Sequence, residues 1–117
     1  MTTGTTHIDI RPLNSTVTAI VIEGNVTSAS EAPLMEAYMA ASAEGARTIV
    51  LDFSGLDYMN SGGIGLLVTL LVRVQRQGQR LTACGLSDHY REILSLTRLD
   101  EAIAIYPSEA DVLATVS

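Results

Sequence analysis

Short apolar runs alternate with segments of helical periodicity along most of this chain, and this alternation limits the folds open to it. Strand-like apolar runs occupy residues 16–22, 47–53, 80–86 and 102–106. Helical patterns follow them at about residues 28–44, 62–77, 88–96 and 109–115. Consecutive strand–helix–strand units imply parallel pairing through right-handed crossovers. We therefore expect an α/β fold with a mostly parallel central sheet and about four helices.

The N-terminal part of the chain predicts an antiparallel hairpin at the start of that sheet. Residues 7–13 alternate in polarity, and Asn14-Ser15 supplies a tight turn into the next run. Gly24-Asn25 is expected to end the second strand. Ser28 with Glu31 matches a capping box, which would begin the first helix.

Length and charge exclude several classes of protein. The 117 residues suit one domain over residues 7–117, after a flexible N-terminus at residues 1–6. A net charge of −6 and scattered arginines argue against direct nucleic-acid binding. The longest strongly apolar segment, residues 64–74, is too short to span a bilayer, so we expect no membrane insertion. With no secretory signal and a single cysteine, Cys84, the cytoplasm is the expected compartment.

A hydroxyl stands where the third strand gives way to the long helix. The segment Asp57–Leu67 places Ser61 at the helix N-terminus, beside Gly62 and Gly63. Free N–H groups and the positive end of the helix dipole make such a position favourable for an added phosphate. The glycines leave no side chain to obstruct an approaching partner backbone. The functional hypothesis therefore centres on Ser61.

The helix that follows Ser61 carries more apolar residues than one buried face requires. At 100° per residue, one stripe is expected to face the core: Ile64, Leu67, Val68, Leu71 and Val72. Leu66, Leu70 and Val74 lie on its flank, and a neighbouring helix would account for Leu70 and Val74. Next to Ser61, a docking surface for a partner would comprise Gly62, Gly65, Leu66 and Thr69, unless these form an ordinary solvated face.

The chain lacks a catalytic, cofactor-binding or metal-binding constellation. The serine elbow of α/β-hydrolases needs glycine at position 59, which is Met59, and only His7 and His89 could act as a base. Neither a P-loop nor a dinucleotide-binding glycine pattern occurs, and the chain has no lysine. One cysteine and two distant histidines do not provide metal-ligand spacing. We expect a non-enzymatic binding module without cofactor or metal.

The segment from Ile49 to Leu67 resembles the central motif of STAS domains, in particular those of bacterial anti-sigma-factor antagonists. The pattern of that motif is apolar–Asp–Ser–Ser/Thr–Gly–apolar–Gly/Ala–x–Leu. Shorter stretches are similar to other family motifs: Glu23–Val26, Gly78–Leu81 and Leu96–Leu99. The resemblance covers about residues 7–116 and implies a STAS-like fold.

The resemblance also implies a partner-switching role. The unphosphorylated protein would bind an anti-sigma factor that is also a serine kinase, and so release a sigma factor. Phosphorylation of Ser61 would end that binding, because about two negative charges would enter an apolar docking patch, and a serine phosphatase would restore it. The residues assigned to the partner-binding surface are Asn60, Ser61, Gly62, Gly65, Leu66 and Thr69.

Two positions depart from the family pattern. Asn60 replaces the usual aspartate, and Gly62 replaces the next hydroxyl residue. Asparagine can still cap a helix, so the fold does not depend on the change at Asn60. Recognition of Ser61 by a kinase would depend on it if the kinase reads the aspartate. Two alternatives therefore stay open: a scaffold-type interaction module without a phosphorylation cycle, and an accessory subunit of a transporter that handles a small ligand or lipid. An enzyme acting through Ser61 ranks last.

Overall fold

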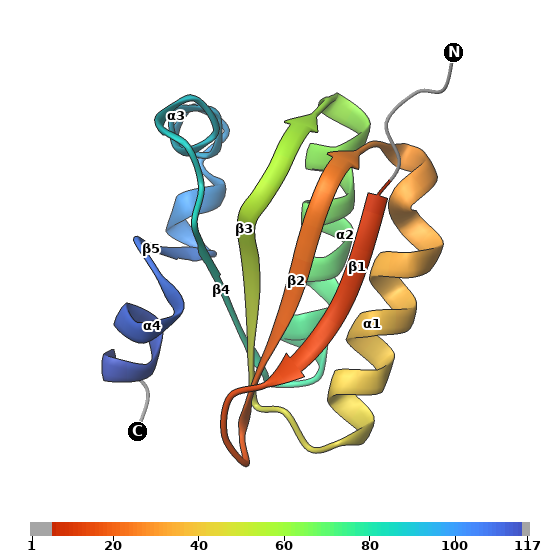
Figure 1. Cartoon of the computed structure of the whole chain (residues 1–117), viewed down its shortest axis with the longest axis vertical. Helices are drawn as coiled ribbons and strands as arrows, with labels where there is room; N and C mark the ends of the chain where they lie inside the picture. The colour runs from red at the N-terminus through yellow and green to blue at the C-terminus, as the bar shows by residue number, and fades with distance from the viewer. Residues whose placement is uncertain (1–5, 116–117) are drawn as a thin grey trace.

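In the computed structural model, which describes residues 6–115, five strands form one sheet that carries helices on both faces (Figure 1). The strands are β1 (Thr6–Pro12), β2 (Val17–Val26), β3 (Thr48–Met59), β4 (Arg80–Cys84) and β5 (Ala104–Tyr106). The helices are α1 (Glu31–Ala43), α2 (Ser61–Arg76), α3 (Asp88–Leu96) and α4 (Glu109–Thr115), with short 3₁₀ turns η1 (Ser28–Ser30) and η2 (Leu99–Glu101).

The sheet has the expected topology. Its strand order is β1-β2-β3-β4-β5, with β1 antiparallel to β2 and every other neighbouring pair parallel. The predicted α/β fold, with an N-terminal hairpin and four helices, is thereby confirmed. Residues 1–5 of the expected flexible terminus lie outside the described residues, and Thr6 already pairs with Gly24 in the hairpin.

The two central strands extend further than the sequence predicted. Gly24 and Asn25 do not end β2, which continues to Val26 beside the second half of β3 with two shifts in register. The stretch 54–59, expected as part of the junction, is therefore strand, because its backbone groups pair with those of residues 23–26. The capping box predicted at Ser28 and Glu31 is also displaced, since Thr27 and Ser30 form it around η1.

The sheet separates a large apolar core from a small one. Helices α1, α2 and α3 cover one face, where buried residues such as Ile20, Leu51, Leu70 and Leu94 pack together. Figure 1 shows α1 and α2 side by side along this face, with α4 at a distance from them. On the opposite face, the packing of α4 is centred on Val112, which joins a smaller cluster of buried strand residues.

Helix α2 is rotated relative to the orientation that the sequence predicted. Its buried residues are Gly63, Leu66, Leu67, Leu70 and Val74. Val68 and Val72, expected to face the core, are 43% and 42% exposed, whereas Leu66, Leu70 and Val74, expected on the flank, are buried. The expectation was therefore wrong for Val68 and Val72, whereas Leu67 is buried and Ile64 and Leu71 pack against the core as predicted. Gly63 lies against Val26 on the side of the helix that is turned toward the sheet.

Candidate functional site

Ser61 lies directly after the carboxyl end of the central strand β3, as predicted, and it is exposed at the first position of α2. Three hydrogen bonds fix this junction. The Met59 N–H donates to the Tyr90 hydroxyl at 2.8 Å, and the Asn60 N–H donates to the Val26 carbonyl at 3.2 Å. The Asn60 side-chain oxygen accepts from the Gly63 N–H at 3.0 Å and caps the helix. The serine hydroxyl is thus presented on a rigid base.

The backbone around Ser61 leaves donors available. The N–H groups of Ser61 and Gly62 have no acceptor among residues 6–115, because they precede the first intrahelical bond, from Ile64 N–H to the Asn60 carbonyl. These donors and the helix dipole favour a negatively charged group at this end of α2. The arginines of α2, Arg73 and Arg76, lie at its other end, roughly 18 Å or more along the helix.

The three glycines near Ser61 have different physical roles. A Cβ on Gly63 would lie 2.5 Å from the Val26 carbonyl oxygen, so only glycine lets α2 approach the sheet this closely. A Cβ on Gly62 would lie 2.9 Å from the Ser28 backbone nitrogen, so a larger residue there would require a local shift of the backbone. At Gly65 a Cβ would meet nothing within 4 Å. Gly65 therefore leaves a flat area on the outside of the helix.

An exposed stripe begins at Ser61 and follows the outside of α2. We call this stripe the α2 face; it comprises Ser61, Gly65, Val68, Thr69 and Val72. Its spacing of three or four residues keeps its members on one side of the helix. Thr69 donates its hydroxyl hydrogen to the Gly65 carbonyl at 3.2 Å, so the polar atom of Thr69 is turned back toward the helix. Between Ser61 and Val72 the α2 face therefore carries no charged side chain, and Val68 and Val72 supply its apolar area.

The structure brings most, but not all, of the predicted partner-binding residues to this surface. Ser61, Gly65 and Thr69 are exposed, whereas Asn60 and Gly62 are half-buried beside them. Leu66 is only 6% exposed and packs in the core, so its assignment to the docking surface was wrong. Val68 is exposed where Leu66 was expected to be, and the spacing of the buried Gly63, Leu66, Leu67 and Leu70 is the sequence signal that could have indicated this.

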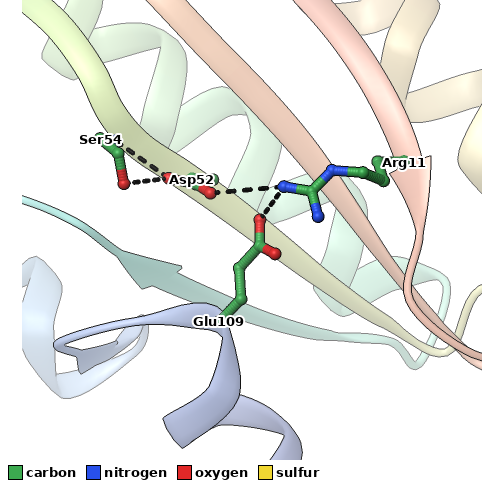
Figure 2. Close-up of polar contacts among 4 residues, drawn as sticks. All are labelled: Arg11, Asp52, Ser54 and Glu109. Atoms are coloured by element: carbon green, nitrogen blue, oxygen red, sulfur yellow. Dashed lines mark hydrogen bonds and ion pairs between the residues drawn. The ribbon is translucent and has the colours of Figure 1, made fainter.

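A second polar cluster, on the opposite face of the sheet, was not predicted from the sequence. Arg11 of β1 donates to the Glu109 carboxylate at 2.6 Å and lies 3.8 Å from the Asp52 carboxylate (Figure 2). Asp52 accepts hydrogen bonds from the Ser54 N–H and hydroxyl at 2.9 and 2.7 Å. The cluster joins three elements and fixes the first turn of α4 against the sheet.

The electrostatics of this cluster are asymmetric. Burial favours a higher pKa for Asp52, but hydrogen bonds from Glu109 and Ser54 and the nearby Arg11 outweigh it, and the pKa is lowered. Hydrogen bonding to Asp52, then burial, raise the pKa of Glu109. Burial, followed by the two carboxylates, raises the pKa of Cys84 to about 12, so its thiol stays protonated and unreactive.

Neither a metal site nor a membrane span is found within the described residues. Across residues 6–115, no three side chains of His, Cys, Asp or Glu are gathered as metal ligands would be. Over the same range, every helix is too short or too polar to cross a bilayer.

Comparison with known proteins identifies the family to which this chain belongs. The family profile described as "Mlab, STAS domain" matches residues 12–107. The protein named "Putative anti-sigma factor antagonist BtrV", from Bordetella bronchiseptica, is 31% identical over 87 residues, which are 74% of this chain and 72% of that protein.

Solved structures share the fold at lower identity. An anti-sigma factor antagonist from Mycobacterium paratuberculosis superposes with a TM-score of 0.81 at 20% identity, covering 96% of this chain and 94% of that one. The antagonist SpoIIAA in its unphosphorylated form gives a TM-score of 0.76 at 17% identity, covering 94% and 96%. The phosphorylated form of the Bacillus protein SpoIIAA gives 0.73 at 16% identity, covering 95% and 100%.

Proposed function

This chain belongs to the STAS domain family, and we propose that it is a non-enzymatic partner-switching regulator, an anti-sigma factor antagonist controlled at Ser61. The unmodified protein would bind an anti-sigma factor that is also a serine kinase, and would thereby free a sigma factor. Phosphorylation of Ser61 would end the complex, and a serine phosphatase would renew it. The observation that carries this proposal is the α2 face, an exposed stripe that begins at a serine hydroxyl and continues over Gly65, Val68 and Val72.

The geometry of this surface supports docking of a partner helix or loop. Val68 and Val72 supply apolar area, and the missing side chain at Gly65 lets a partner backbone approach the helix. Asn60 contributes from the rim by capping the helix, and the missing side chain at Gly62 leaves room for Ser28 beside the junction. The exposed Ser61 lies where the partner that reads the α2 face would also reach its hydroxyl.

The same geometry explains how phosphate would act without unfolding the protein. A phosphate on Ser61 would carry about two negative charges and lie near the unpaired N–H groups and positive dipole end of α2, which tolerate it. For a partner, however, burying the α2 face would then require desolvating that charge beside apolar side chains. The modification would therefore weaken the complex and leave the fold intact.

Phosphate transfer by a cognate anti-sigma factor with kinase activity tests this proposal directly. The parent protein, Ser61→Ala, Ser61→Asp and Asn60→Asp would be incubated with the kinase and ATP, and phosphate incorporation followed by intact mass spectrometry. We expect Ser61→Ala to bind the factor normally but to accept no phosphate, and Ser61→Asp to bind more weakly. Asn60→Asp restores the family residue and should accept phosphate faster if the asparagine has slowed the kinase.

The docking surface requires a separate comparison. Gly65→Glu places a bulky charge in the centre of the α2 face, where a side chain has open space, so binding should be lost while the thermal transition is retained. Ala40→Glu adds the same charge to an exposed position of α1 and serves as the matched control. Unimpaired binding by Gly65→Glu would place the interface elsewhere.

The departures at Asn60 and Gly62 favour one alternative, a scaffold-type STAS module without a phosphorylation cycle. That alternative predicts binding through the α2 face, no phosphate on any of the four proteins, and full binding by Ser61→Asp. An accessory role in a transporter would instead appear as a stable complex with a transport ATPase or permease and no affinity for an anti-sigma factor.

A further inference from the structure

Two arginines near the far end of α2 have no anionic partner within the described chain. Ion pairs among residues 6–115 engage Arg11 and Arg91, and Arg80 donates to the Tyr106 hydroxyl. Arg73 and Arg76 are exposed and have no carboxylate within 4.0 Å in that range. On a chain of net charge −6, two neighbouring cations of this kind form a local positive site.

These arginines line a groove between the C-terminal halves of α1 and α2. The groove has a volume of about 590 Å³, and its lining includes Tyr38, Met39, Ser42, Arg73, Arg76 and Gln77. Met39 is 54% exposed, so the groove also offers an apolar contact. The site therefore combines two guanidinium groups with one large flexible apolar side chain.

A hydrogen-bond network holds the base of the groove rigid. The Tyr38 hydroxyl donates to the Gln79 side-chain oxygen at 2.7 Å and lies 3.3 Å from the Arg73 carbonyl oxygen, which also accepts from it. The Gln79 amide donates in turn to the Ser42 hydroxyl at 3.0 Å and to the Ala46 carbonyl at 2.9 Å. Helix α1, helix α2 and the start of β4 are thereby joined, so the groove exists before any ligand binds.

The groove continues the α2 face. Val72, the last residue of that face, lies one helical turn before Arg76, on the same side of the helix. A partner segment that follows α2 from Ser61 toward its C-terminus would pass Val68 and Val72 and then reach the two arginines. A carboxylate on that segment would be attracted by these arginines, although the chain as a whole carries a net charge of −6.

We propose that the groove between α1 and α2 receives an acidic segment of the protein partner, with its carboxylates on Arg73 and Arg76 and an apolar side chain against Met39. A protein segment fits better than a small anion, because the groove is open, is lined by residues of two helices and includes the exposed apolar side chain of Met39. The assignment of the partner rests on the proposed function, whereas the preference for an acidic peptide is a property of the groove itself. The contact fixes the direction in which the partner lies along α2.

The preference of the groove can be measured with a defined peptide. The probe is a short peptide with two glutamates one helical turn apart and one leucine, and its counterpart carries lysines instead of the glutamates. Added to ¹⁵N-labelled protein, the glutamate peptide should shift the amide signals of Met39, Arg76 and Gln77, and the lysine peptide should not. Arg73→Gln/Arg76→Gln should weaken binding roughly two- to thirtyfold, as expected for two exposed ion pairs, and added salt should weaken binding to the parent.

Matched variants separate this proposal from the proposed function. Arg91→Gln/Arg98→Gln removes the same charge from α3 and the turn after it, and should bind the peptide as the parent does. Gly65→Glu should lose the anti-sigma factor but keep the peptide. If the factor binds the parent and Arg73→Gln/Arg76→Gln equally, or the peptide shows no preference for the groove, the groove proposal is overturned and the proposed function stands. If the glutamate peptide binds in the groove but no anti-sigma factor binds the parent, the groove stands and the proposed function fails.

Discussion

Alanine at Gly63 and at Gly65 should have opposite effects on stability, although the two glycines are two residues apart on one helix. Replacing glycine by alanine inside a helix gains about 1 kcal/mol from propensity, and this gain applies to both positions. At Gly65 the new methyl group meets nothing within 4 Å, so the gain is kept. At Gly63 it would lie 2.5 Å from the Val26 carbonyl oxygen and 2.7 Å from the Met59 side chain.

The magnitude follows from that overlap. The Met59 side chain can move, but the Val26 oxygen belongs to the backbone of β2, so α2 must shift away from the sheet. Overpacking of this kind costs about 1–3 kcal/mol, and because propensity cancels between the two variants, this is also the difference expected between them. For 117 residues, 1 kcal/mol corresponds to about 4 °C in Tm, so the Tm values should differ by about 4–12 °C.

Equilibrium unfolding in urea, followed by circular dichroism, measures this difference. An unchanged m-value would show that unfolding exposes the same amount of surface in both variants, so that their unfolding free energies can be compared directly. If the two variants differ by less than about 0.5 kcal/mol, the contact between Gly63 and Val26 does not set the rotation of α2. The outward orientation of the α2 face would then be set by other contacts of α2 with the sheet.

Three further outcomes follow from contacts described above. Asn60→Ala should cost about 1 kcal/mol in unfolding free energy through loss of the helix cap, whereas Asn60→Asp keeps the cap and should be as stable as the parent or more so; equal urea midpoints for Asn60→Ala and the parent would contradict this. In unfolding free energy, Leu70→Ala should cost about 2–5 kcal/mol and Val68→Ala less than about 1 kcal/mol, because of these two side chains Leu70 is buried and Val68 is exposed. Similar losses of unfolding free energy in the two variants would contradict the burial pattern. Because the pKa of Glu109 is raised in the folded protein, the parent should lose stability as the pH rises from the ordinary value of 4.5 through that raised value. Glu109→Gln should therefore gain stability relative to the parent over the same pH range, as measured by urea titrations. A difference in stability that does not change with pH would refute the coupling of Glu109 to Asp52.

The sequence predicted the sheet well because its strands are marked locally. Apolar strand-like runs alternate with helical patterns, and glycines such as Gly45 and Gly78 end the helices. Together these signals determine the element order and hence the topology. The second half of β3 was missed for the opposite reason. Ser54, Gly55 and Asp57 have low strand propensity, and only pairing with the end of β2 makes them strand.

The candidate site was predicted in position but not in orientation. The placement of Ser61 followed from the strand–helix junction alone, whereas the rotation of α2 depended on which of several overlapping apolar stripes faced the sheet. The contact of Gly63 with Val26 joins residues far apart in sequence, so the spacing of Gly63, Leu66, Leu67 and Leu70 could not be distinguished from the other apolar stripes before that contact was known. The cluster of Arg11, Asp52 and Glu109 was missed because it brings together three distant segments.

The order of strands in the sheet also has a consequence for how the protein assembles. Each strand pairs only with the strands that precede and follow it in the chain, so spatial order and order of synthesis coincide. A chain emerging from the ribosome can therefore extend the sheet one strand at a time, and no gap has to be held open for a later strand to enter. The packing of α4 over the sheet, through Glu109 and Arg11, follows once residues 109–115 have been made.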